Sequence, residues 1–112
     1  MMTPNKAIEI VDKLKPNPYS EEDKLRWINE LDGMVQRLVI QSDNVNQYAY
    51  PDDMDKELLI PAPFDDCYTL FLEAKIDYYN REYANYNNSA MMFEAQFSEY
   101  KKAYIREHPA RG

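Results

Sequence analysis

Hydrophobic residues recur every three or four positions in four stretches of the chain, which predicts four helices. The first helix should cover residues 4–15, where Ala7, Ile8 and Val11 fall on one face. A Thr-Pro pair at positions 3 and 4 is typical of a helix start. The prolines at 16 and 18 should end this helix, because each disfavours the helical conformation in the residue before it.

The second helix should run from Ser20 to about Ile40. The Ser20 hydroxyl can cap the helix N-terminus, and three acidic residues that follow it favour the positive end of the helix dipole. Six apolar residues then recur at helical spacing: Leu25, Ile28, Leu31, Val35, Leu38 and Val39.

Residues 64–108 predict a helical hairpin. The third helix should begin near residues 65–66, and its apolar stripe consists of Leu72, Ile76, Tyr79, Tyr83 and Tyr86. The stripe of the fourth helix consists of Phe93, Phe97, Tyr100 and Tyr104, and this helix should stop before Pro109. The polar run 87–89 predicts a break with Ser89 as a new N-cap, although one long helix could also contain it.

The middle segment, residues 41–63, is rich in Asn, Asp and Pro and lacks helical periodicity. Its one apolar run, residues 58–60, predicts either a short strand or an extended segment laid on the helices. We therefore expect an all-α single domain over residues 1–112. It should be a small bundle of about four helices with a long acidic loop between the second and the third, and a tail from 109 to 112.

The net charge of −7 comes almost entirely from this middle part of the chain. Residues 41–66 contain seven acidic residues and one lysine. A general nucleic-acid binder would need a basic face, so we expect no specific nucleic-acid binding. The carboxylates of Asp52, Asp53, Asp55 and Glu57 are candidates for contact with a partner. They do not form an EF-hand loop, because the glycine that such a loop needs at its sixth position is replaced by Glu57.

Catalytic and metal chemistry find no support in the sequence. The chain has one cysteine, Cys67, and one histidine, His108, and no motif joins them as nucleophile and base. Cys67 falls in the first turn of the third helix, where the dipole could lower its pKa, but a small semi-buried side chain is the favoured interpretation. We expect no catalytic residue, no metal and no cofactor, and hence no enzyme.

The chain contains ten tyrosines, and those near the predicted hairpin turn are candidate interface residues: Tyr78, Tyr79, Tyr83 and Tyr86. Three interpretations remain open for them. They pack in the core, they form a subunit interface, or they stack on single-stranded nucleic acid, which the acidic residues among them disfavour. No apolar stretch approaches the length of a membrane span, and residues 1–10 lack the apolar run of a signal peptide, so we expect a cytoplasmic protein without membrane contact.

Three segments resemble small proteins of tailed phages and Gram-positive prophages, namely the head-tail connector (adaptor) proteins. They are LLIPAPFDD at 58–66, AKIDYYNRE at 74–82 and YNNSA at 86–90. The resemblance extends over roughly residues 1–108. It implies a non-enzymatic helical subunit that forms a homo-oligomeric ring below the portal protein, contacts a stopper or tail-completion protein, and lets DNA pass. Such a protein is assembled in the host cytoplasm and becomes part of the virion.

The acidic loop fits this expectation in one respect. A ring through which DNA slides should not attract phosphate, and residues 52–57 would repel it, so we expect them to face the tunnel or the portal. The alternative is a small intracellular interaction module, such as an acidic phage-encoded regulator or DNA mimic. A mimic would spread its carboxylates over an ordered face, whereas here they cluster in one loop, which favours the connector.

Overall fold

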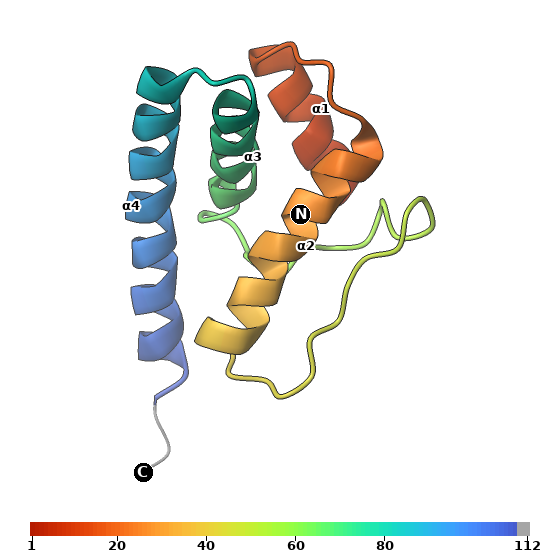
Figure 1. Cartoon of the computed structure of the whole chain (residues 1–112). Coiled ribbons are helices and arrows are strands. Elements are labelled where there is room, and N and C mark those ends of the chain that lie inside the picture. Colours follow the sequence, from red (N-terminus) through yellow and green to blue (C-terminus); the bar gives the residue numbers. More distant parts are fainter. Residues whose placement is uncertain (110–112) are drawn as a thin grey trace.

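The computed structural model describes residues 1–109, and within that range the regular secondary structure is entirely helical (Figure 1). The elements are α1 (Pro4–Leu14), α2 (Glu21–Met34), η1 (Val35–Val39), α3 (Asp66–Tyr79) and α4 (Tyr83–Glu107). The segment η1 continues α2 with wider, π-type turns. The predicted all-α helical bundle is therefore confirmed.

Two of the three predicted N-caps form, those at Thr3 and Ser20. The Thr3 hydroxyl accepts a hydrogen bond from the Lys6 backbone N–H over 3.2 Å, and the Ser20 hydroxyl accepts one from the Asp23 N–H over 3.1 Å. Each cap satisfies a backbone donor that has no partner inside its helix. The starts of α1 and α2 are thus determined by local sequence.

Helix α3 occupies the centre of the bundle. It runs antiparallel to α4 in a hairpin, and α1 and α2 pack against it (Figure 1). Apolar residues from each of these elements form one core, in which Val11, Leu31, Val35, Leu72 and Ile76 have no exposed surface. This burial is the main favourable contribution to folding.

The turn of the hairpin differs from the prediction. Helix α3 ends at Tyr79, and residues 80–82 form the connection, so Tyr83 begins α4. The Arg81 N–H bonds to the Tyr78 carbonyl and the Glu82 N–H to the Asp77 carbonyl, which is the Schellman pattern of a helix end. Arg81 adopts the left-handed conformation (φ 60°) at the position where glycine is usual. The sequence therefore lacks the glycine that would have indicated this turn.

Ser89 is therefore not an N-cap. It lies inside α4, is buried, and donates a hydrogen bond to Asp77 Oδ2 over 3.0 Å. A side chain from the facing helix supplies its partner, which is why a sequence pattern typical of a break is tolerated inside a helix.

The middle segment packs against the helices. Met54, Leu58 and Ile60 are buried, and the backbone of Leu58 bonds to Met2 at the chain start. Within residues 1–109 no strand forms, so the possible strand at 58–60 is wrong. The N–H groups of Leu59 and Ile60 instead reach the side chains of Asp32 and Tyr68, in place of a partner strand.

Candidate functional site

The candidate site is a surface groove between α2, α3 and α4, with a volume of about 600 Å³. We call it the aromatic groove and define it by six of its lining residues: Met34, Phe71, Tyr78, Tyr79, Tyr86 and Phe93. Apolar and aromatic side chains therefore form most of its lining, which also contains the charged side chains of Glu30, Lys75 and Glu94.

The rings in the groove support one another and remain accessible. Tyr78 packs edge-on against Tyr79 with centroids 5.3 Å apart, and its ring is tilted against that of Tyr86 with centroids 5.5 Å apart. Tyr78 and Tyr79 are still 50% and 49% exposed. Aromatic rings that are already held in place lose little freedom on binding, so this surface is suited to a protein contact.

Two of the charged side chains in the groove form an ion pair. Lys75 Nζ lies 3.0 Å from Glu30 Oε2, which joins α3 to α2. The same ammonium group lies 5.4 Å from the centroid of the Phe71 ring. The groove thus combines aromatic with charged side chains, which is the usual composition of a protein interface.

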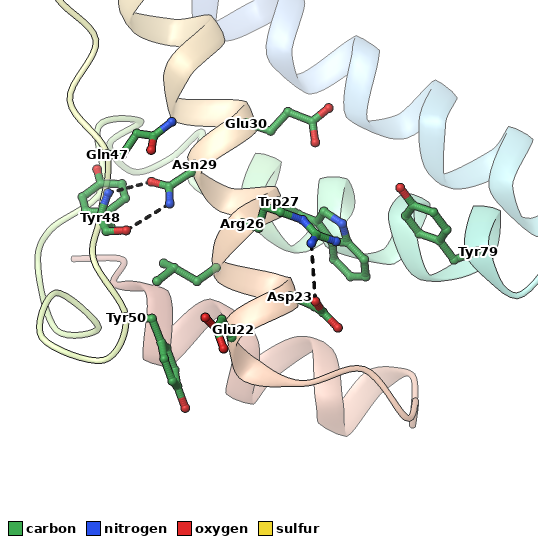
Figure 2. A pocket seen from close by; sticks show the side chains of 11 residues that line it. Glu22, Asp23, Arg26, Trp27, Asn29, Glu30, Gln47, Tyr48, Tyr50 and Tyr79 are labelled. Carbon is green, nitrogen blue, oxygen red and sulfur yellow. Dashed lines mark hydrogen bonds and ion pairs between the residues drawn. The ribbon is translucent and has the colours of Figure 1, made fainter.

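Trp27 supports the groove from within the core, and the sequence analysis did not identify it as a site residue. Its ring stacks on Tyr79 with centroids 5.5 Å apart and an interplanar angle of 10°, while Tyr19 packs edge-on against it. Figure 2 shows Trp27 and Tyr79 on the same side of α2. Tyr79 therefore contributes to packing through one ring face and to the surface through the rest.

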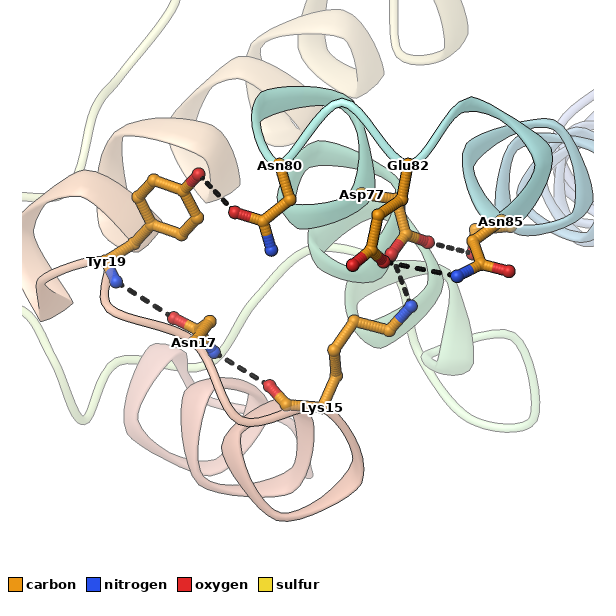
Figure 3. A network of polar contacts seen from close by, with 8 residues as sticks. Lys15, Asn17, Tyr19, Asp77, Asn80, Glu82 and Asn85 are labelled. Carbon is orange, nitrogen blue, oxygen red and sulfur yellow. Dashed lines mark hydrogen bonds and ion pairs between the residues drawn. The ribbon is translucent and has the colours of Figure 1, made fainter.

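A polar network fixes the end of α3 that carries these tyrosines (Figure 3). Asp77 is fully buried and pairs with Lys15, which follows α1, and with Ser89 of α4. The Tyr19 hydroxyl donates to Asn80 Oδ1 over 2.7 Å. Three other segments thus hold this helix end, so the groove is formed before any partner arrives.

The structure brings together three of the four tyrosines that the sequence analysis selected. Tyr78, Tyr79 and Tyr86 line the groove. Tyr83 lies in the first turn of α4, is 57% exposed, and is not among the lining residues. The sequence pattern did not identify the remaining groove residues, such as Phe71 and Phe93. Apolar residues that face a core and apolar residues that face a half-exposed groove recur at the same spacing along a helix.

The four carboxylates of the middle segment have different surroundings. Asp53 accepts a hydrogen bond from the Ala49 N–H over 2.7 Å and lies 3.2 Å from Lys56, and both contacts lower the pKa of Asp53. Asp55 accepts from Asn5 over 2.7 Å. Asp53 and Asp55 therefore hold local structure.

Asp52 and Glu57 are exposed, and neither forms an ion pair within residues 1–109. These two carboxylates are the ones free to act on a partner.

Cys67 has the properties of a core residue. It has no exposed surface, and burial together with the nearby carboxylates raises the pKa of its thiol to about 12. The low pKa considered from its place in the first turn of α3 is thus contradicted. Among residues 1–109 no group of three metal-binding side chains comes together. None of the helices in that range is both long and apolar enough to cross a membrane.

Comparison of the chain with protein-family models, with curated protein sequences and with solved structures found no match.

Proposed function

We propose that this protein is a structural subunit of a tailed-phage or prophage virion, of the head-tail connector type, and that copies of it assemble through the aromatic groove. The observation that carries the assembly role is the pair of half-exposed tyrosines, Tyr78 and Tyr79, above an apolar hollow of about 600 Å³. The class of assembly comes from the resemblance of residues 58–66, 74–82 and 86–90 to connector proteins.

The physical properties of the groove favour a protein partner. Interfaces concentrate their binding energy in central aromatic residues and surround them with polar groups that exclude water. The groove contains both kinds of residue, with Tyr78 and Tyr86 in its lining together with the Glu30–Lys75 ion pair. Its volume accepts one or two large side chains of a neighbouring subunit.

The exposed carboxylates support the passage of DNA. Asp52 and Glu57 project from a segment that Met54 and Leu58 anchor in the core. An anchored acidic surface repels phosphate without binding it, as a channel wall for DNA requires. In this proposal the same surface faces the tunnel or the portal protein.

The assembly role is tested with a groove variant and a matched control. We expect the double variant Tyr78→Ser and Tyr86→Ser to remain monomeric under conditions in which the wild type assembles on its portal protein, because the variant lacks two aromatic contacts of the groove. Tyr83→Ser removes an exposed tyrosine outside the groove and should assemble like the wild type. Native mass spectrometry and electron microscopy of the complexes measure the outcome. Assembly of both variants alike would contradict the role of the groove.

The connector class has its own test, which does not depend on the groove. Genes that flank this one should encode capsid, portal and tail proteins, and deletion of the gene should leave filled heads and tails unjoined in lysates. A neighbourhood of host metabolic genes, or normal virions after deletion, would overturn the class.

A further inference from the structure

Residues 45–49 run extended beside α2 and η1, and the side-chain amides of Asn29 in α2 and Gln36 in η1 hold their backbone. Asn29 donates to the Tyr48 carbonyl over 3.1 Å and accepts from the Tyr48 N–H over 2.7 Å (Figure 2). Gln36 donates to the Asn46 carbonyl over 2.9 Å and accepts from the Asn46 N–H over 2.7 Å. Each side-chain amide thus forms the two hydrogen bonds that the backbone of one residue in a neighbouring strand would form.

The other edge of this segment has no partner. In an extended chain, successive residues direct their N–H and C=O groups to opposite sides. Since Asn46 and Tyr48 bond towards α2, Val45 and Gln47 direct theirs away from it. Within residues 1–109 the backbone groups of Val45 and Gln47 have no hydrogen-bond partner, and both residues are exposed. The segment therefore presents the free edge of a strand.

Hollows adjoin this segment on two sides. One, of about 590 Å³, lies against α2 and includes Trp27, Tyr48 and Tyr50 (Figure 2). The other, of about 390 Å³, includes Ile40 and Leu59. Gln47 and Tyr48 line both. Hollows of this kind would receive the alternate side chains of a strand laid along the free edge, as peptide recognition by strand addition requires.

The charge of the larger hollow selects the partner. Its lining contains three carboxylates and one cation, Arg26. Arg26 lies 3.7 Å from Asp23, and Glu30 lies 3.0 Å from Lys75 of the aromatic groove, so Glu22 is the lining carboxylate that has no ion pair within residues 1–109. The Tyr48 and Tyr50 rings add faces that attract cations. Two copies of this chain paired edge to edge would bring two acidic hollows together, and like charges disfavour that arrangement.

We propose that the free backbone edge at Val45 and Gln47 binds an extended segment of a partner protein by strand addition, and that lysine or arginine side chains of that segment enter the hollow beside Tyr48 and Tyr50. This interaction goes beyond the proposed connector function. Its backbone edge lies outside the aromatic groove, although the larger hollow shares Glu30 and Tyr79 with that groove, and the interaction requires no ring.

The experiment selects peptides against the full chain and then removes single backbone donors. A displayed library of random decapeptides is selected, and the recovered sequences are synthesised with blocked ends and titrated calorimetrically. We expect alternating sequences with Lys or Arg. N-methylation of alternate peptide amides should weaken binding about tenfold, because backbone hydrogen bonds are lost without any change to the protein.

Variants of the protein complete the test. Gln47→Pro removes an N–H that has no partner in the free chain, so it should fold normally and bind about tenfold more weakly. Gln47→Ala removes the same side chain but keeps the N–H, so it should bind about tenfold more tightly than Gln47→Pro. Circular dichroism verifies that both variants fold.

Three outcomes would overturn the proposal. One is that no peptide is recovered whose binding depends on its amide groups or on the Gln47 N–H. Another is that the recovered peptides lack basic residues and bind equally well after Glu22→Gln. The third is a wild-type dimer in sedimentation that Gln47→Pro abolishes, which would make a second copy the occupant.

Discussion

The Tyr68 hydroxyl of α3 donates a hydrogen bond to Asp32 of α2 over 2.5 Å, in the interior of the protein. The same carboxylate accepts from the Tyr48 hydroxyl over 2.6 Å and from the Leu59 N–H over 3.3 Å. The Tyr68 oxygen in turn accepts from the Ile60 N–H over 2.7 Å. This pair therefore ties two helices to the middle segment and determines where that segment lies.

Tyr68→Phe should lower the free energy of unfolding by about 2 to 3 kcal/mol, because the change leaves the Ile60 N–H and one Asp32 oxygen buried without a partner. Urea unfolding at neutral pH measures the loss. Tyr104→Phe is the matched control, since Tyr104 is half-buried and its hydroxyl bonds to no group within residues 1–109, and it should change stability little. Equal losses in the two variants would refute the role of the network.

The stability of the protein should depend on the protonation of Asp32. Burial raises the pKa of this carboxyl above its ordinary value of 3.8, and the hydrogen bonds from Tyr48, Tyr68 and Leu59 only partly oppose the shift. The folded chain keeps this proton at a pH where the unfolded chain has released it. The resulting stabilisation is complete below the unfolded pKa and is lost as the pH rises through the folded pKa.

The difference in unfolding free energy between the wild type and Asp32→Asn isolates this effect, because other titrating groups contribute equally to both. We expect the wild type to lose stability relative to the variant as the pH rises from below the ordinary pKa of 3.8 towards neutral pH. A relative gain over that range would mean that the fold lowers the pKa of Asp32.

Two lysines near the end of α1 provide a matched pair for the buried network. Lys15 pairs with Asp77, which is fully buried, whereas Lys13 lies 3.2 Å from Glu9 on an exposed surface. Lys15→Met should cost about 2 kcal/mol or more, since it leaves a buried charge without its partner. Lys13→Met should cost less than about 0.5 kcal/mol. Thermal and urea unfolding compare the two, and similar costs would contradict the importance of the network.

Arg81→Gly should stabilise the protein by about 0.5 to 1 kcal/mol, because glycine adopts the left-handed conformation of residue 81 without steric cost. Arg81→Ala tests whether loss of the charged side chain explains the gain, and it should give no increase. The shift in the urea midpoint measures both variants. An equal gain from alanine would show that backbone conformation is not the cause.

The sequence by itself determined the features that depend on neighbouring residues. The hydroxyls of Thr3 and Ser20 cap the helices whose starts they were expected to mark, because a cap needs only a donor a few residues away. Helical periodicity located most of the buried apolar face of α1, α2 and α4, whereas the stripe predicted for the third helix continued past its end to Tyr83 and Tyr86, which lie in α4. The acidic character of residues 41–66 likewise required no tertiary information.

Only the tertiary structure decided which polar residues are buried and where the hairpin turns. Asp32 and Asp77 resemble solvent-facing acids in the sequence, and they are buried because their partners come from remote positions, Tyr68 and Lys15. Ser89 was mistaken for a cap for the same reason.

The aromatic groove and the strand edge at residues 45–47 also exist only in three dimensions. Spacing does not distinguish a groove from a core, and the amides of Asn29 and Gln36 reach the backbone of a segment that sequence patterns left without structure. Contacts between distant parts of the chain form only when the core brings those parts together, so the local sequence pattern cannot predict them.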